Sequence, residues 1–260
     1  MSIESAEAAV ATLPVTTPVE LDAGPGPKGR IGMVALATDA VSELDVARLL
    51  PAGEVALYVN RVENANTVTL ESLAAMAHDL GRAAAGILPE APLDAMIYGC
   101  TSGTIAIGEE AVFERLRRAR PALPCTTPIT AARAAFEVLG VTSVAVLTPY
   151  IDEINQTVRA HLEDHGIRVV AMASFHAATD SETARIPPRA IRDAAIALDR
   201  AEAQALFVSC TALRAIDAIA EIEATLAKPV VTSNQALAWH ALRLLGDERP
   251  VPGFGRLLEI

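Results

Sequence analysis

The fold of this chain is decided by two stretches, residues 95–104, AMIYGCTSGT, and residues 205–212, ALFVSCTA. Each begins with an apolar run of strand length and leads to a cysteine, Cys100 in the first and Cys210 in the second, that is followed by threonine. Short apolar runs of this kind are typical of strands that are buried on both faces of a parallel sheet. We therefore expect each cysteine to lie at the carboxyl end of a strand.

The two stretches belong to a longer repeat. The cysteines are 110 positions apart (210 − 100), and the same shift places residues 34–38, VALAT, on residues 144–148, VAVLT. A slightly smaller shift places residues 124–127, PCTT, on residues 229–232, PVVT. Agreement of several elements at nearly one offset indicates an internal duplication. It predicts two similar lobes whose strand ends, with both cysteines, face each other across a cleft, where open α/β sheets bind ligands.

From residue 30 onward, strand-like and helix-like segments alternate, which indicates parallel sheets covered by helices. Strands are expected at 31–37, 54–59, 95–99, 125–127, 144–148, 169–173, 205–209 and 230–232. Helices are expected near 43–49, 70–88, 108–118, 129–139, 151–165, 188–202, 214–226 and 235–245.

These segments predict an α/β protein of two pseudo-symmetric lobes, each a mostly parallel sheet flanked by helices, with the active site between them. We expect residues 30–128 plus 235–260 to form the first lobe and residues 129–234 the second. Residues 1–29 are rich in proline and glycine, and we expect a flexible tail there.

The composition argues against several classes of protein. The net charge of the 260 residues is −11 (21 Lys and Arg against 32 Asp and Glu) without a visible basic patch, so we expect no nucleic-acid partner. Apolar runs are too short or too interrupted to span a membrane. Three widely spaced cysteines and no signal peptide indicate the cytoplasm. Only Lys28 and Lys228 are lysines, and neither is well placed for the Schiff base that pyridoxal phosphate needs.

The chemistry of the chain is expected at Cys100 and Cys210. Each cysteine is predicted to precede a helix, whose free amides, with the hydroxyls of Thr101, Ser102 and Thr211, form an anion-binding nest. A thiol at the start of a helix has its pKa lowered, which favours the reactive thiolate. The third cysteine, at position 125, has no matching partner and is expected to pack in the core.

Four further polar side chains lie near expected strand ends or in a neighbouring loop. Thr38 and Asp39 end the first strand, and Tyr150 ends its counterpart in the second lobe. The tyrosine suits either a hydrogen bond to substrate or simple packing. Asp180 lies in a segment that is typical of a turn and helix cap, or of a loop over the cleft.

A histidine pair, His161 and His165, has the i, i+4 spacing that can bind a metal ion. It lies among Glu163, Asp164 and Gly166 on what reads as a solvated helix end. This setting favours an ordinary surface role, and we expect no metal site.

The motifs resemble those of the aspartate/glutamate racemase superfamily. The similarity is to the branch of maleate cis–trans isomerases and arylmalonate decarboxylases, and most of all to its ectoine-utilisation A group. It covers roughly residues 30–258 and extends to residues 147–150, LTPY, residues 229–234, PVVTSN, and residues 252–257, PGFGRL. The resemblance implies two α/β lobes with the active site between them, and no metal or organic cofactor.

The resemblance also implies roles for individual residues. Cys100 and Cys210 match the catalytic pair of the superfamily, and further positions match groups that bind substrate or an oxyanion. The expected substrate-binding residues are Thr38, Asp39, Thr101, Ser102, Tyr150, Asp180 and Thr211. Arylmalonate decarboxylases carry glycine at the first cysteine position, and maleate isomerases carry neutral amides where Asp39 and Asp180 stand. These departures favour a carboxylate that also carries nitrogen.

The predicted function is therefore that of a cofactor-independent, two-cysteine racemase or isomerase of a small carboxylate in the breakdown of ectoine-derived diaminobutyrate compounds. One cysteine would remove the Cα proton and the other would protonate the opposite face. The alternatives are a maleate cis–trans isomerase that works by thiolate addition, an arylmalonate-type decarboxylase, and a two-lobed metabolite-binding protein without catalysis. We expect a homo-oligomer, either a dimer or a tetramer.

Overall fold

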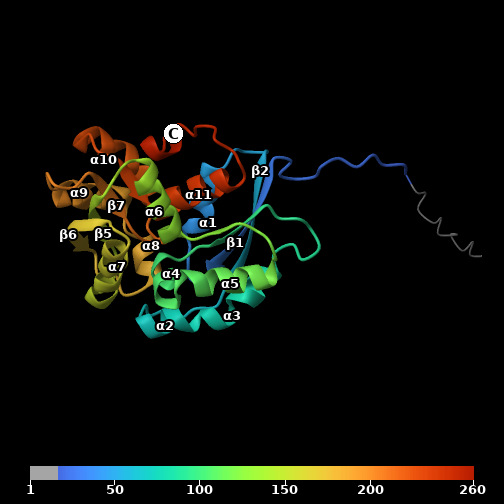
Figure 1. Cartoon of the computed structure of the whole chain (residues 1–260), viewed down its shortest axis with the longest axis horizontal. Helices are drawn as coiled ribbons and strands as arrows, with labels where there is room; N and C mark the ends of the chain where they lie inside the picture. Colours follow the sequence, from blue (N-terminus) through green and yellow to red (C-terminus); the bar gives the residue numbers. More distant parts are fainter. Residues whose placement is uncertain (1–16) are drawn as a thin grey trace, which may run out of the picture.

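The computed structural model describes residues 17–260, which form two lobes that lie side by side (Figure 1). The first lobe holds a parallel sheet with strand order β2-β1-β3-β4, and the second holds a parallel sheet with order β6-β5-β7-β8. The second order is the first with every strand number raised by four. The predicted α/β fold of two similar lobes is confirmed.

The strands are β1 Gly29–Leu36, β2 Val55–Val62, β3 Ala95–Tyr98, β4 Cys125–Thr126, β5 Ser143–Thr148, β6 Arg168–Ser174, β7 Ala205–Val208 and β8 Val230–Thr232. The α-helices are α1 Ser42–Leu49, α2 Leu70–Ala75, α3 Ala77–Ala85, α4 Thr101–Ile107, α5 Glu109–Ala119, α6 Pro128–Val138, α7 Asp152–Asp164, α8 Asp180–Ala184, α9 Pro188–Leu198, α10 Ile219–Leu226 and α11 Ser233–Leu244. Two short 3₁₀ helices are η1 Ile216–Ala218 and η2 Arg256–Glu259.

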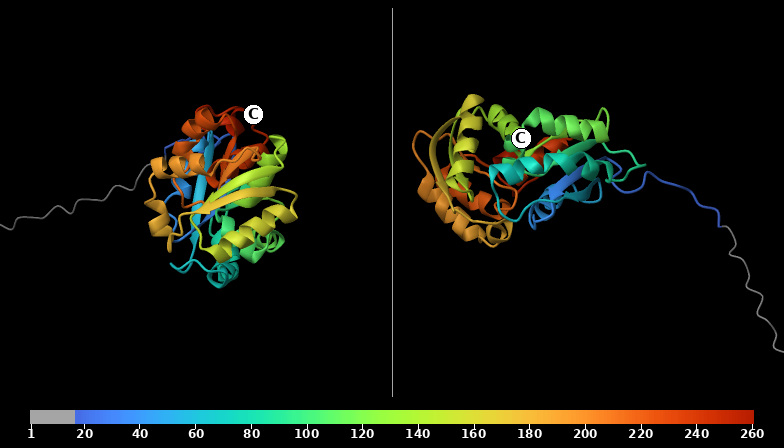
Figure 2. Two further views of the ribbon diagram at one scale, coloured as in Figure 1. Left: turned by 90° about the vertical axis from the view of Figure 1, so that its left-hand side faces the viewer. Right: turned by 90° about the horizontal axis from the view of Figure 1, so that it is seen from below.

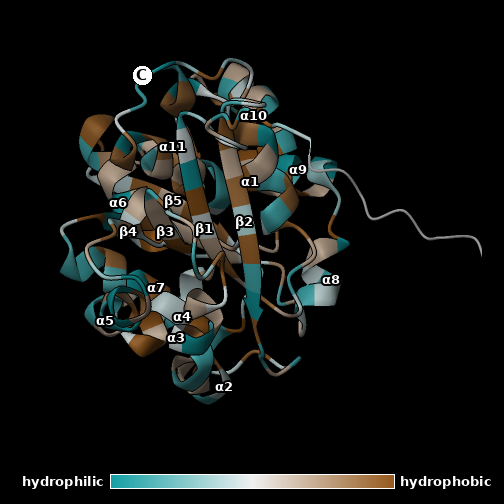
Figure 3. Ribbon diagram, turned by 90° about the vertical axis from the view of Figure 1, so that its right-hand side faces the viewer, coloured by the Kyte–Doolittle hydropathy of each residue, from teal (hydrophilic) through white to brown (hydrophobic). Residues whose placement is uncertain are grey.

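The central strands are apolar because helices cover both faces of each sheet. Every residue of β3, β5 and β7 is buried, whereas the edge strand β2 is only partly covered. Figure 3 shows the apolar residues along β1 and β2, and the hydrophilic residues of the surrounding helices α2, α3 and α5. Burial of both sheets leaves the strand ends as the place where polar side chains gather.

Helices α6 and α11 join the two lobes. They follow the last strand of each sheet and pack against each other. On α6, Phe136 meets Phe207 of β7 edge to face, with ring centroids 5.6 Å apart. On the other side, α11 packs against α1 and β3 of the first lobe. Each lobe is thus covered in part by a helix whose preceding strand belongs to the other lobe. Figure 2 shows the two lobes from two further sides.

Three expectations about local structure are corrected. The helix expected over 70–88 is two helices, α2 and α3, that meet at Met76. The separate helix α4 lies between Cys100 and α5. No helix begins after Cys210, where the chain turns before η1. The Thr211 carbonyl accepts a hydrogen bond of 2.9 Å from the side chain of Asn234 on α11. This backbone group therefore bonds to another element and not to a following turn of helix.

The tail predicted at residues 1–29 is described only in part. Residues 1–16 lie outside the described part of the chain. Residues 17–28 carry no helix or strand and are mostly exposed, and β1 already begins at Gly29. Within the described residues, no helix is both long enough and apolar enough to cross a membrane.

Candidate active site

The carboxyl ends of β3 and β7 bring Cys100 and Cys210 to one cavity between the lobes. The cavity is small, about 20 Å³, and both cysteines are almost fully buried. Its walls are formed by Leu36, Asp39, Asn64, Ala65, Val68, Ser72, Leu73, Met76, Cys100, Thr101, Ser102, Tyr150, Asp180, Cys210, Thr211 and Ala212. The structure therefore brings together eight of the nine residues expected from the sequence. The ninth, Thr38, lies behind Asp180 and donates a hydrogen bond to its carboxylate.

Cys100 lies directly before α4 and caps it, since its sulfur accepts a hydrogen bond of 3.2 Å from the amide of Gly103. The Ser102 hydroxyl lies 3.9 Å from the same sulfur. These contacts favour the thiolate, but burial outweighs them and raises the pKa of Cys100 to about 12, with a further contribution from the charge of Asp180. The expectation of a lowered pKa is therefore wrong for Cys100. The start of the short helix α4 lowers the pKa of the thiol less than the loss of water around the sulfur raises it.

Cys210 has a strained backbone instead of a helix start. Its φ of +152° lies in a region that residues with a side chain rarely adopt. The Ser233 hydroxyl accepts a hydrogen bond of 3.0 Å from the Cys210 amide and lies 2.9 Å from the Thr101 hydroxyl of the other lobe. Ser233 thus connects the two strand ends that carry the cysteines. The sequence placed Ser233 in a family motif but gave no signal for this contact.

The pKa of the Cys210 thiol is also raised well above its ordinary value. Burial is the main cause and the charge of Asp180 is the next, against a hydrogen bond from the Tyr150 hydroxyl. The lowered pKa expected here is therefore wrong as well. Burial likewise keeps the Tyr150 phenol protonated, with its pKa well above the usual range, so that its hydroxyl is a hydrogen-bond donor at neutral pH. The Thr211 hydroxyl donates to the carbonyl of Gly99 in the other lobe, at 3.2 Å.

Two carboxylates face the same cavity. One oxygen of Asp39 accepts hydrogen bonds from the amides of Val41 at 2.7 Å and Ser42 at 2.9 Å, which fixes the turn after β1. The other oxygen is buried and has no hydrogen-bond partner in the described part of the chain. Burial raises the pKa of Asp180, the Thr38 hydroxyl lowers it, and the charge of Asp39 raises it again. Among the described residues no Lys, Arg or His lines this cavity.

Nothing in the sequence indicated the cavity-lining residues that lie between β2 and the end of α2. Asn64, Val68 and Ser72, which belong to the connection after β2 and to α2, also line the cavity. Thr67 of this connection forms an antiparallel β-bridge with Thr179, directly before α8 of the second lobe. This Thr67–Thr179 bridge connects the two lobes beside the residues that line the cavity. An irregular loop has no periodic pattern from which such a contact could be predicted.

Comparison with known proteins places the chain in a family. The arylmalonate decarboxylase family model matches residues 106–258. The chain belongs to the arylmalonate decarboxylase family. The predicted resemblance to the branch of arylmalonate decarboxylases and maleate isomerases is confirmed, whereas the closeness to the ectoine-utilisation A group stays a prediction.

Relatives in this family are similar over different lengths. The arylmalonate decarboxylase of Bordetella bronchiseptica is 36% identical over 143 residues, which cover 53% of this chain and 58% of that protein. The maleate isomerase of Nocardia farcinica is 29% identical over 240 residues, which cover 88% of this chain and 95% of that protein.

A solved structure of a Nocardia farcinica maleate cis–trans isomerase, a cysteine-to-serine mutant with a covalently bound succinylcysteine intermediate, superimposes with a TM-score of 0.82. It is 27% identical and covers 89% of this chain and 98% of that one. This family member and its relative thus share the whole two-lobed architecture.

Proposed function

We propose that this family member is a cofactor-independent isomerase, and that it transfers a proton between the two faces of Cα in a small, nitrogen-bearing carboxylate. The observation that carries the proposal is the pairing of two buried thiols with two carboxylates in one cavity that no cationic side chain lines among the described residues. A second substrate carboxylate would be repelled by Asp39 and Asp180, whereas an ammonium or amide group would be attracted.

The proposed reaction needs one thiolate and one thiol. The thiolate removes the Cα proton, so that a C–H bond breaks and an S–H bond forms, and the electron pair moves into an enediolate. The opposite thiol then gives its proton to the other face of Cα and is left as the thiolate. Inversion requires such acid–base groups on opposite faces. The hydroxyls of Thr101, Ser102 and Tyr150 are the donors that would stabilise the enediolate.

The raised thiol pKa values impose a condition on this mechanism. With a pKa of about 12, Cys100 is a thiolate in about one molecule in ten thousand at pH 8. A substrate ammonium beside Asp180 would cancel the negative charge that opposes ionisation of both cysteines. The correct substrate would thereby help to generate the base that attacks it, and an acid without nitrogen would not.

A maleate isomerase is the second candidate. It is favoured by a specific observation, the match of 88% of this chain to a maleate isomerase that also has the same architecture. Here one thiolate adds to the cis double bond, the C–C bond rotates, and elimination of the thiolate gives the trans isomer. The same two cysteines serve both reactions. A decarboxylase of the arylmalonate type is supported by the family model but would need a dianionic substrate in the same acidic cavity.

The biological setting is part of the proposal. Diaminobutyrate derivatives from ectoine breakdown combine a carboxylate with an amine or amide, which is the substrate class that the cavity suits. We place this breakdown in the cytoplasm, and we expect the protein to act as a dimer or tetramer.

The proposal is tested by proton NMR in D2O with aspartate, glutamate, 2,4-diaminobutyrate and its N-acetyl forms, ectoine and maleate. Wild type is compared with Cys100→Ser, Cys210→Ser and a control, Cys125→Ser, whose cysteine lies in β4 and does not line the cavity. We expect loss of the α-proton signal of one nitrogen-bearing acid, with either active-site variant at least 100-fold slower and the control unchanged.

Other outcomes reject the proposal. Growth of a trans-alkene signal from maleate, without exchange at Cα, would assign the isomerase of the second candidate. Binding of one compound without reaction, at equal affinity in the double serine variant, would show a metabolite-binding protein in which the cysteines have no catalytic role.

A further inference from the structure

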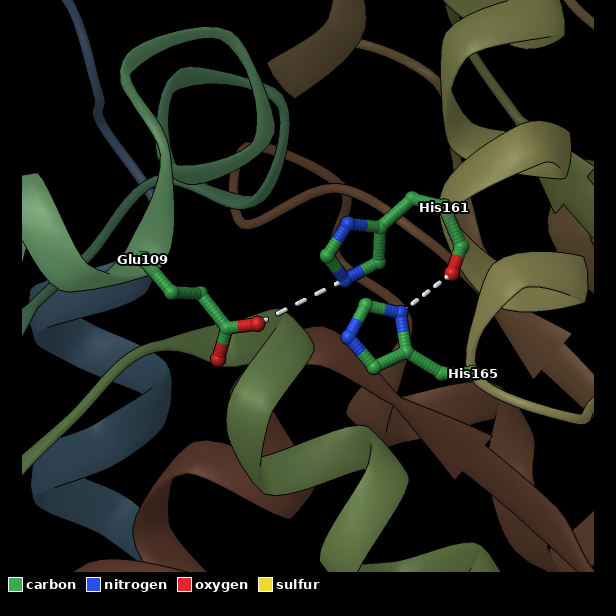
Figure 4. A group of neighbouring side chains, drawn as sticks. All are labelled: Glu109, His161 and His165. Atoms are coloured by element: carbon green, nitrogen blue, oxygen red, sulfur yellow. Dashed lines mark hydrogen bonds and ion pairs between the residues drawn. The ribbon is translucent and has the colours of Figure 1, made fainter.

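A second cluster of chemically active side chains lies between the lobes, away from the cysteine cavity. Glu109 is the first residue of α5 in the first lobe, and His161 and His165 lie at the end of α7 in the second lobe. One side-chain ligand atom from each residue lies within 4.8 Å of the others. Figure 4 shows both imidazole rings on the same side of α7, facing the carboxylate. The solvated setting expected from the sequence is therefore confirmed for His165, which is exposed, and is wrong for His161, whose side chain is only 14% exposed.

The hydrogen bonds of this cluster leave nitrogen lone pairs unused. Nε2 of His161 is buried, has no hydrogen-bond partner among residues 17–260, and lies 3.6 Å from Oε1 of Glu109. Nδ1 of His165 donates to the backbone carbonyl of His161 at 2.7 Å (Figure 4), which fixes the tautomer and leaves the Nε2 lone pair of His165 free. Metal-binding histidines are commonly oriented by such a contact.

We propose that Glu109, His161 and His165 bind a divalent transition metal ion, with Zn²⁺ as the ion that best fits this ligand set. Two imidazole nitrogens and one carboxylate oxygen, completed by water, form a common four-coordinate zinc site. Ligand distances of about 2.0–2.1 Å place tetrahedral ligand atoms about 3.4 Å apart. The separation between His161 and Glu109 is already close to this value, and the His165 ligand atom lies within 4.8 Å of both, so a small adjustment of the exposed His165 side chain would complete the set.

The surroundings of Glu109 limit the expected affinity. Arg133 forms an ion pair with the same carboxylate, with its guanidinium nitrogens 2.8 Å from Oε1 and 3.0 Å from Oε2. The Thr130 hydroxyl also donates to the carboxylate. These contacts hold the carboxylate in place, but the positive charge of Arg133 opposes a second cation. We therefore expect a dissociation constant on the order of micromolar, far weaker than that of a dedicated structural zinc site.

The inference does not depend on the proposed reaction, because these ligands do not line the cysteine cavity. A bound ion would connect α5 of one lobe with α7 of the other and would hold the lobes together. Since it binds only where both lobes are folded, it would also raise the melting temperature of the protein.

Titration calorimetry of the untagged, full-length protein with Zn²⁺ tests the site. We expect binding of one ion, weakened at least 10-fold by His165→Ala and by Glu109→Gln. The matched control His78→Ala removes a histidine that is 88% exposed on α3 and should leave the affinity unchanged. Arg133→Met keeps most of the aliphatic stem and removes the opposing charge, so it should bind Zn²⁺ more tightly than wild type.

Several results would overturn the assignment. The first is absence of saturable binding by wild type, and the second is equal affinity in wild type and His165→Ala. Cobalt substitution provides an independent readout, because a thiolate-to-cobalt absorption band would show that the ion had bound to cysteines instead. A cobalt spectrum without that band, lost in His165→Ala, would support the site.

Discussion

Replacing Asp45 by asparagine is expected to stabilise the protein at neutral pH. Asp45 lies on α1, is 4% exposed, and accepts a hydrogen bond of 2.9 Å from the side chain of Asn234. Burial raises the pKa of Asp45 from 3.8 to about 6, although the Asn234 hydrogen bond and Arg48 act in the opposite direction. An asparagine can still offer a carbonyl oxygen to Asn234, and it carries no charge that must be buried.

The size of the effect follows from linkage between protonation and folding. The folded-state pKa of Asp45 lies above the unfolded value. The contribution of protonated Asp45 to stability is therefore fully present below pH 3.8, and it is lost as the pH rises through about 6. At 1.36 kcal/mol per pKa unit, ionisation of the buried group costs about 3 kcal/mol above pH 7. At pH 5 the same linkage gives about half of that value.

Urea unfolding, followed by the fluorescence of Trp239, the single tryptophan, measures the difference at pH 7.5 and pH 5. Asp45→Asn should exceed wild type in free energy of unfolding by about 2–3 kcal/mol at pH 7.5 and by clearly less at pH 5. The control Asp217→Asn changes an exposed partner of Arg48 and should shift stability by less than about 1 kcal/mol. The reasoning would be refuted if Asp45→Asn were less stable than wild type at pH 7.5. It would also be refuted if the difference in free energy of unfolding between variant and wild type were the same at both pH values.

Three further changes have definite expected outcomes. Asp180→Asn removes the charge that, after burial, is the largest cause of the raised Cys210 pKa. Alkylation of Cys210 by iodoacetamide at pH 8, located by mass spectrometry, should therefore become faster; an unchanged rate would contradict the assignment of that charge. Ser233→Ala leaves the buried Cys210 amide without its acceptor and should lower the free energy of unfolding by about 1–3 kcal/mol, whereas Ser233→Thr, which keeps the hydroxyl, should recover most of it. Phe136→Ala opens a cavity beside the Phe207 ring and should cost about 3–5 kcal/mol in urea unfolding; a loss below about 1 kcal/mol would show that the two rings do not support the junction of the lobes.

The elements of the fold were predictable because the signals are local and repeated. Both faces of the central strands are buried, so an apolar run such as residues 205–208 indicates a strand without knowledge of its neighbours. The repeated cysteine then identified the strand ends that meet at the cavity. The duplication, not any single motif, made the pair at Cys100 and Cys210 stand out from Cys125.

What the sequence did not predict depends on contacts between distant segments. The raised pKa of Cys100 depends on complete burial between the lobes, and a motif at a helix start carries no measure of that burial. Asn64 lines the cavity from a loop that pairs, through Thr67, with Thr179 of the other lobe. His161 appeared solvated because its helix neighbours are polar, but Glu109, 52 positions earlier in the chain (161 − 109), covers it.

The Thr67–Thr179 bridge has a consequence for hydrogen isotopes. If the bridge keeps the two lobes together over Cys100 and Cys210 during the proposed reaction, a proton taken from substrate would exchange only slowly with bulk water. In D2O the inverted product would carry deuterium from the opposite thiol, and substrate that returns unreacted would keep its original hydrogen. A variant that cannot form the bridge would let that proton escape, and deuterium would then enter both enantiomers at similar rates. The isotope content of recovered substrate is thus a measure of how long the two lobes stay closed.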